Sequence, residues 1–289
     1  MVISDRELIE KEIQLVRELA GVGSDEIEIN DKGWTSRVYV ISGGKYVFKF
    51  PRTQEVKKEY IQEIKIYNLL EKLDAHLQVP KVRWTHTEND YFGYEGIIGT
   101  QFATSVTNLR DEHKQNLGKD IGEFLRELHS REIEDPYIMK VEDEILQAQE
   151  NYRVCLSVLK ASFSPKEIIV LDRFINHYMP KRMLELGGNS VLCHGDLGYW
   201  NMILKADGSL GIIDFGDVGF YDASKDFCGL QDEIMLNSAL GAYGDNMILR
   251  DKIKIRQKYI PFFDLKYFVE CKDRHKIEET LMTIKTYLL

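Results

Sequence analysis

Two short motifs in the second half of the chain limit what it can fold into more than any other feature does. The first reads His-Gly-Asp, and Asn201 follows its Asp196 by five positions. The second reads Asp-Phe-Gly and begins at Asp214. Between them, two apolar segments, Met202–Leu204 and Leu210–Ile213, flank an Asp-Gly turn, which is a pattern typical of a β-hairpin. Such a hairpin would return the chain so that Asn201 and Asp214 could share one ion.

The residue types in these motifs suit phosphoryl transfer from a nucleotide. A carboxylate such as Asp196 can orient a hydroxyl and accept its proton, while Asn201 and Asp214 offer the oxygen ligands that magnesium prefers. Protein kinases use the same order of groups, in H-R-D-x-x-x-x-N and D-F-G. An Asp-Asn pair by itself is more often a turn or a helix cap. Both motifs in this order, each beside a β-like segment, favour a kinase-type site.

With Gly195 where protein kinases have Arg, the motifs resemble those of the aminoglycoside phosphotransferase family, which shares the protein-kinase fold. The likeness is nearest to the aminoglycoside 2″-phosphotransferases, because a D-F-G-D element at Asp214 precedes a second acidic element at 221–227. There, Phe-Tyr-Asp-Ala replaces the Gly-Asp-Pro of that group, and Tyr199 and Trp200 inside the first motif are also unusual. No A-P-E segment follows Asp214, so a small-molecule acceptor is expected rather than a protein.

Carried onto this sequence, the resemblance implies that Asp196 is the catalytic base and that Asn201 and Asp214 are magnesium ligands. His194 takes the position that braces the catalytic loop. The implied phosphoryl donor is a nucleoside triphosphate, GTP or ATP, with Mg²⁺ as cofactor. The implied fold is α+β and protein-kinase-like, with a small antiparallel-sheet lobe and a mainly helical lobe.

The pattern of apolar residues agrees with two lobes joined by a hinge. We expect an N-terminal nucleotide-binding lobe over residues 1–95, a hinge over 96–99, and a helical C-terminal lobe with the catalytic loop and substrate site over 100–289. We expect a first helix that begins with a capping box at Ser4 and ends near Leu19. The other expected N-terminal elements are strands at 27–29, 37–41 and 45–50, a helix at 56–73, and a hairpin of 83–86 with 92–95. In the second lobe, 121–129 is the clearest predicted helix.

Lys49 stands among the apolar residues of the 45–50 strand and is the expected phosphate-binding lysine. A lysine on the solvent face of an edge strand is the simpler alternative. Its expected carboxylate partner on the following helix is Glu63, with Glu59 one turn earlier as the other choice.

The loop between the first two strands is expected to cover the phosphates of the nucleotide. It has no G-x-G-x-x-G motif, and only Gly33 remains of the glycines. The resemblance implies a short loop whose amides and hydroxyls hold phosphate oxygens, and Thr35 and Ser36 are the candidates. A turn with these residue types needs no function.

The expected hinge begins after the last strand of the first lobe. In the resembling fold the purine meets hinge backbone, which here is expected between Glu95 and Ile97. The resemblance places Tyr94 just before the hinge, in front of the inner pocket behind the purine. In the aminoglycoside 2″-phosphotransferases, a bulky residue at this position accompanies a preference for guanine nucleotides. GTP is therefore expected to serve at least as well as ATP. Simple packing of Tyr94 in the lobe's core is the alternative.

Composition and charge bound the remaining possibilities. The chain has 289 residues, 44% of them hydrophobic, and a net charge of −9, which is enough for one large domain or two lobes. The acidic balance disfavours nucleic acid and suits a cationic partner. No apolar run approaches the roughly 18 residues of a membrane helix, and the charged N-terminus predicts no secretory signal. Four widely spaced cysteines form no metal-binding pattern, so a cytoplasmic protein is expected, and a monomer.

Three functions remain open from the sequence. The first is an aminoglycoside O-phosphotransferase, whose polycationic substrate would need clustered carboxylates; the candidates are Asp232 and Glu233, with Glu270 and Asp273 near the C-terminus. Solvated helix faces explain the same residues equally well. The second is a kinase of another small alcohol, such as a macrolide, choline, or a sugar or amino-acid alcohol. The third is a nucleotide-binding pseudokinase, which the intact motif residues disfavour.

Overall fold

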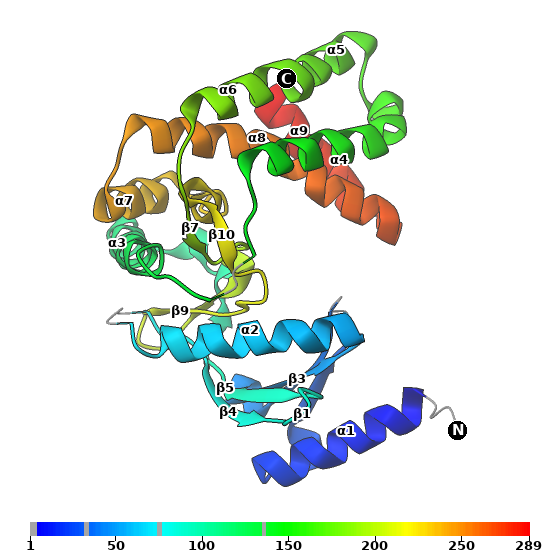
Figure 1. Ribbon diagram of the computed structural model, residues 1–289, viewed down its shortest axis with the longest axis vertical. Helices are drawn as coiled ribbons and strands as arrows, with labels where there is room; N and C mark the ends of the chain where they lie inside the picture. Colours follow the sequence, from blue (N-terminus) through cyan, green and yellow to red (C-terminus); the bar gives the residue numbers. More distant parts are fainter. Residues whose placement is uncertain (1–4, 32–34, 74–76, 135–136) are drawn as a thin grey trace.

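An antiparallel sheet with a helix on each side forms the first part of the chain (Figure 1). The structure is a computed structural model and describes residues 5–31, 35–73, 77–134 and 137–289. The sheet has five strands in the order β1 (Ile27–Asn30), β2 (Ser36–Ile41), β3 (Tyr46–Pro51), β5 (Phe92–Glu95) and β4 (Lys81–Thr85). The strand that carries Lys49 is therefore central, and the alternative of an edge strand is wrong.

The two faces of this sheet have different partners. Helix α1 (Asp5–Ala20) covers one face, where Phe48 and Phe50 belong to one apolar cluster with its residue Val16. Helix α2 (Gln54–Leu70) covers the other face and lies between the sheet and the second part of the chain (Figure 1). Because successive side chains of a strand point to opposite faces, Lys49 faces α2. The predicted N-terminal elements are present within a few residues of their expected ends; Ser4, the proposed cap, lies outside the described residues.

The second part of the chain is mainly helical. Its helices are α3 (Asp111–Leu128), α4 (Val141–Ser162), α5 (Pro165–Arg173), α6 (Met179–Leu186), α7 (Glu233–Tyr243), α8 (Met247–Cys271) and α9 (Arg274–Leu288). Two small sheets interrupt them: β7 (Ser190–Cys193) pairs with β10 (Gly219–Asp222), and β8 (Met202–Leu204) lies between β6 (Thr100–Gln101) and β9 (Leu210–Ile212). The predicted α+β, protein-kinase-like fold is confirmed. The expected hinge, 96–99, lies between β5 and β6, and the lobe boundaries remain predictions.

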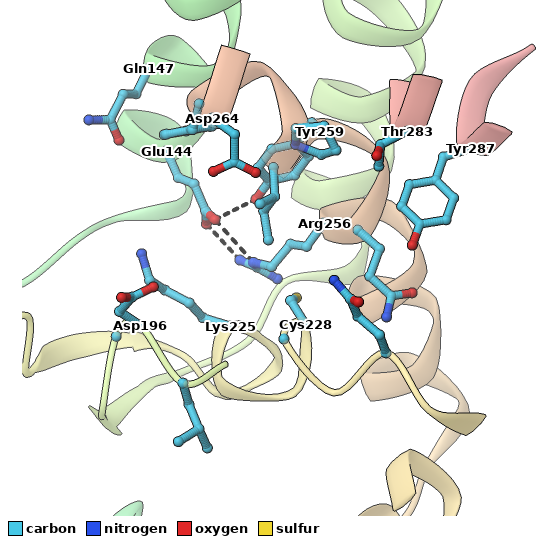
Figure 2. A pocket seen from close by; sticks show the side chains of 18 of the residues that line it. Glu144, Gln147, Asp196, Lys225, Cys228, Arg256, Tyr259, Asp264, Thr283 and Tyr287 are labelled. Atoms are coloured by element: carbon cyan, nitrogen blue, oxygen red, sulfur yellow. Dashed lines mark hydrogen bonds and ion pairs between the residues drawn. The ribbon is translucent and has the colours of Figure 1, made fainter. Parts of the chain in front are cut away.

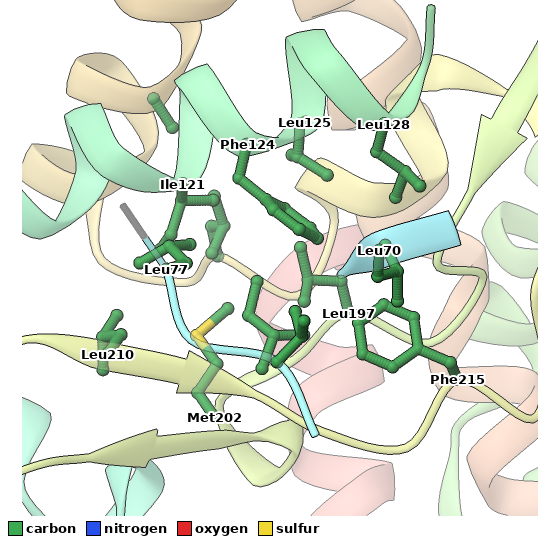
Figure 3. Packing of buried hydrophobic residues seen from close by; sticks show 14 of the residues in the cluster. Leu70, Leu77, Ile121, Phe124, Leu125, Leu128, Leu197, Met202, Leu210 and Phe215 are labelled. Carbon is green, nitrogen blue, oxygen red and sulfur yellow. The ribbon is translucent and has the colours of Figure 1, made fainter. Parts of the chain in front are cut away.

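A shared apolar core holds the site between the two parts. Leu70 and Leu77 from the first part pack in one cluster with side chains of α3 and with Leu197 and Phe215 from the two motifs (Figure 3). The chain after α2 also joins the motif hairpin directly, since Ile212 N–H donates to the Gln78 carbonyl at 2.9 Å. A second apolar cluster holds α4, α5, α6, α8 and α9 together. Packing of Leu197 and Phe215 thus fixes the loops that carry the two motifs.

Two expectations from composition can be compared with the structure. Among the described residues, no helix is both long and apolar enough to cross a membrane. All four cysteines are free thiols; Cys155, Cys193 and Cys228 are buried and Cys271 is exposed.

Candidate functional site

A buried ion pair joins the central strand of the sheet to α2. Lys49 is 8% exposed. Its Nζ atom lies 2.6 Å from Glu63 Oε1 and 3.1 Å from Asp214 Oδ1. Burial alone would lower the pKa of Lys49, but the two carboxylates outweigh it and raise that pKa well above its usual value. The structure therefore pairs Lys49 with Glu63, as the sequence predicts, while Glu59 is exposed one turn earlier.

The predicted hairpin brings the ends of the two motifs together. Residues 202–204 pair with 210–212, and Ile213 N–H donates to the Asn201 carbonyl at 3.0 Å. Asp214 adopts φ +64°, a left-handed conformation that is uncommon outside glycine and is concentrated at functional sites. This turn directs its carboxylate toward Lys49 while leaving the side chain 54% exposed.

Asn201 and Asp214 carry the kind of oxygen atom that a magnesium ion prefers as a ligand. The charge of Lys49 lowers the pKa of Asp214, so its carboxylate stays ionised, and the side chain remains exposed. The amide nitrogen of Asn201 donates to Asp196 O at 2.8 Å and to Asp196 Oδ2 at 2.9 Å, which turns the amide oxygen to the other side. Hard oxygen donors of this kind match the preference of Mg²⁺.

Asp196 lies at the cleft surface within a network of hydrogen bonds. Its Oδ2 atom accepts from Asn201 Nδ2 and from Trp200 Nε1 at 3.2 Å. Partial burial raises the pKa of Asp196, and the nearby carboxylate of Asp217 adds to the effect. Gly195 precedes it with φ +88°, and a Cβ atom there would lie 2.1 Å from the Asp217 carbonyl oxygen. Only glycine fits this turn, which explains why Gly replaces the Arg of protein kinases.

His194 is fully buried and makes the contacts of a strut. Asp196 N–H donates to its Nδ1 at 3.3 Å, and its Nε2 lies 3.0 Å from the Ile213 carbonyl oxygen. Since Nδ1 accepts, Nε2 carries the proton and donates. The ring also packs on Phe215, with 4.6 Å between ring centroids. His194 thereby connects the two motifs.

Asp226 is a supporting residue that the sequence did not reveal. It is fully buried, and its carboxylate accepts from His194 N–H at 2.7 Å, Gly195 N–H at 2.9 Å and His129 Nε2 at 3.1 Å. Burial alone would raise the pKa of Asp226, but the hydrogen bond and charge of His129 outweigh it and lower that pKa. The acidic element at 221–227 was the available signal, but its contact with the catalytic loop depends on the tertiary fold.

The candidate phosphate loop is only partly supported. Gly33 lies outside the described residues. Thr35, the first described residue after this gap, is exposed. Ser36 is only 3% exposed, and its hydroxyl shares a 2.7 Å hydrogen bond with the Tyr60 hydroxyl. Ser36 starts β2 and its hydroxyl is turned toward Tyr60 of α2, so this contact does not support a phosphate-binding role for the hydroxyl.

The expected hinge residues divide into buried and exposed ones. Tyr94 is buried, and its ring packs on Tyr67 of α2 at 5.4 Å between centroids. Ile97 is buried as well, whereas the Glu95 carboxylate turns outward and meets Arg83 at 2.9 Å. Any contact of Glu95 with a purine would therefore have to come from its backbone.

A cavity of about 280 Å³ opens beside Asp196 in the helical part (Figure 2). Glu144 from α4 and Asp264 from α8 lie across it from Asp196 and Lys225. The guanidinium of Arg256 pairs with Glu144 at 2.6 Å and offsets its charge. Asp264, by contrast, has no ion-pair partner in the described part of the chain. Burial and the nearby Asp196 raise the pKa of Asp264 to about 6.

The carboxylates that the sequence suggested for the acceptor lie elsewhere. Asp232 caps α7 and meets Lys114 Nζ at 2.7 Å, and Asp273 caps α9. Glu233 and Glu270 are exposed on helix faces. None of these four residues lines the cavity. Capping and solvation account for these four residues in the structure, whereas Asp264, which sequence reasoning missed, lines the cavity.

Comparison with known proteins identifies the family. The model of the phosphotransferase enzyme family matches residues 26–247. The chain belongs to the phosphotransferase enzyme family. This membership supports a phosphotransferase, and it agrees with the resemblance drawn from the two motifs.

Solved structures of similar fold include several phosphotransferases. A GDP complex of aminoglycoside 2′-phosphotransferase-IIIa aligns with a TM-score of 0.78 at 19% identity, over 96% of this chain and 97% of that one. A gentamicin complex of APH(2″)-IIa aligns with a TM-score of 0.71 at 21% sequence identity, over 98% of this chain and 97% of that one. A choline/ethanolamine kinase family protein from Mesorhizobium loti aligns with a TM-score of 0.65 at 15% sequence identity, over 96% of this chain and 94% of that one. At such low identity these likenesses establish the fold and leave the acceptor open.

Proposed function

We propose that this phosphotransferase moves the terminal phosphoryl group of a nucleoside triphosphate to a hydroxyl of an aminoglycoside. One observation carries the proposal: Asp196 lines the same cavity as Asp264, whose carboxylate has no ion-pair partner among the described residues. Asn201 joins Asp196 to the strand end that precedes Asp214, and Asp214 pairs with Lys49, which suits phosphates. An ammonium group of the acceptor would meet Asp264, and a neighbouring hydroxyl would reach Asp196.

The residues of this site have separate tasks in the reaction. Lys49 binds phosphate oxygens of the donor. Asp214 and Asn201 would hold magnesium, which supplies charge neutralisation at the phosphates. Asp196 hydrogen-bonds the acceptor hydroxyl and takes its proton as the oxygen–phosphorus bond forms and the bond to the leaving nucleoside diphosphate breaks. Positioning and electrostatics contribute most of the rate, because the transition state of phosphoryl transfer is loose.

A second candidate is a kinase of a smaller amino alcohol that also carries an anionic group. The observation in its favour is Lys225, which lines the same cavity and has no ion-pair partner within the described residues; its Nζ lies over the Tyr221 ring at 4.3 Å. An ammonium in the cleft repels a polycation and suits a carboxylate. An amino-acid alcohol offers both charges.

A nucleotide-consumption screen tests the proposal. The acceptors are kanamycin, gentamicin, a macrolide, choline, and the pair L-homoserine and 3-aminopropan-1-ol, which differ by one carboxylate. Consumption with kanamycin or gentamicin, and its loss in Asp264→Asn, supports the first candidate. Consumption with homoserine alone, and its loss in Lys225→Met, supports the second. A folded, nucleotide-binding protein that phosphorylates none of them contradicts both.

A further inference from the structure

The indole of Trp200 touches the carboxylate that the proposed reaction depends on. Its Nε1 atom lies 3.2 Å from Asp196 Oδ2, and the side chain lines the acceptor cavity. Trp200 is 46% exposed, which is unusual for a tryptophan and places its ring at the cleft wall. A tryptophan indole is a donor only, so the direction of this hydrogen bond is fixed.

The catalytic loop is built to seat this ring. A Cβ atom on Gly198 would lie 2.4 Å from Trp200 Cζ2, so the indole packs directly on the backbone of that glycine. Gln101 Nε2 donates to the Trp200 carbonyl at 3.2 Å and holds the same residue from the other side. The position of the indole N–H therefore follows from the loop itself.

Two donors bind the same oxygen of Asp196. Asn201 Nδ2 and Trp200 Nε1 both meet Oδ2, at 2.9 and 3.2 Å. With Oδ2 occupied in this way, Oδ1 is the oxygen that a substrate hydroxyl would meet. The amide of Asn201 is fixed by its additional bond to the Asp196 backbone carbonyl, so the indole supplies the second, independent constraint on the carboxylate plane.

We propose that Trp200 is a positioning residue for Asp196, and that its indole N–H holds the carboxylate so that Oδ1 faces the acceptor hydroxyl. This inference rests on the proposed role of Asp196 as catalytic base. The ring also forms the cleft wall, so a phenylalanine in its place keeps the wall and removes only the donor. Trp200→Phe therefore separates positioning from acceptor binding.

The kinetic test compares four variants on the acceptor found in the screen. Trp200→Phe should lower kcat by about tenfold to a hundredfold, the factor that corresponds to one hydrogen bond to a charged group, with KM for the acceptor nearly unchanged. Trp200→His should recover part of kcat, because histidine Nε2 occupies the same ring position as indole Nε1. Gly198→Ala, which displaces the ring, should behave like Trp200→Phe. Trp84→Phe, in the sheet of the other lobe, is the matched control and should match wild type.

A spectroscopic test needs no turnover. The indole N–H resonance that disappears in Trp200→Phe belongs to Trp200, and it should move in Asp196→Ala because its acceptor is lost. An unmoved resonance, or an unchanged kcat in Trp200→Phe while Asp196→Asn is inactive, overturns the positioning role and leaves the proposed function intact. Wild-type turnover in Asp196→Asn would instead overturn the proposed function, while the resonance still reports the contact.

Discussion

The ammonium of Lys49 lies 2.6 Å from the carboxylate of Glu63, and this pair ties the central strand of the sheet to helix α2. Both side chains are almost fully buried, so neither charge has water as an alternative partner. The geometry of the nucleotide site and the stability of the small lobe therefore depend on the same contact.

Replacing Glu63 by Gln should weaken both properties. The unfolding free energy should fall by about 2 kcal/mol, the scale of a hydrogen bond to a charged group, and the affinity for nucleotide should fall with it. Denaturant unfolding and calorimetry measure the two effects. Glu59→Gln, on an exposed position one turn away, is the control and should change neither; equal effects in both variants would contradict the assignment of Glu63.

Asp214→Ala should abolish magnesium-dependent nucleotide binding, because a hard cation loses its charged ligand. Asn201→Ala should be milder, since only a neutral oxygen is removed. Calorimetry with nucleotide, with and without magnesium, measures both. If the Asp214 variant keeps the magnesium dependence of wild type, the metal assignment is wrong.

The raised pKa of Asp264, about 6, predicts a pH dependence for a cationic acceptor. Below that value the carboxyl is protonated and neutral, so KM should rise as the pH falls through about 6 and level off above it. Asp264→Asn should raise KM and remove this dependence, and added salt should raise KM in wild type by screening the charge. Glu270→Gln, on the same helix but outside the cavity, should behave as wild type.

Tyr94 and Tyr67 pack together with 5.4 Å between their ring centroids, and we expect them to limit the space behind the purine. GTP should therefore be used at least as well as ATP, and Tyr94→Ala should shift the ratio of their specificity constants toward ATP. A strong preference for ATP in wild type that is unaltered in the variant would show that Tyr94 only packs in the core.

Local sequence patterns predicted the parts of the site that depend on local structure. The Asp-Gly turn predicted the hairpin that sets Asn201 beside Ile213, and a lysine between apolar strand residues predicted the inward position of Lys49. Asp264 could not be predicted in this way, because nothing in the local sequence distinguishes it from other acidic residues of a long helix, and only the tertiary fold places it at the cavity.

Two candidate residues from the sequence have other contacts in the structure, for the same reason. The carboxylate of Asp232 suited a substrate site by charge, but it caps α7 and pairs with Lys114. The hydroxyl of Ser36 suited a phosphate, but its place at the start of β2 turns it toward Tyr60. In both cases the residue type was compatible with two uses, and only the tertiary contact decided between them.

The most direct test of the central claim is transfer by Asp196→Asn beside wild type, with product detected by mass spectrometry. Wild type should add one phosphoryl group to its acceptor. Asp196→Asn should bind nucleotide with unchanged affinity and transfer at least about a hundredfold more slowly, the lower range for loss of an acid–base group. Transfer by Asp196→Asn at the wild-type rate would contradict the account.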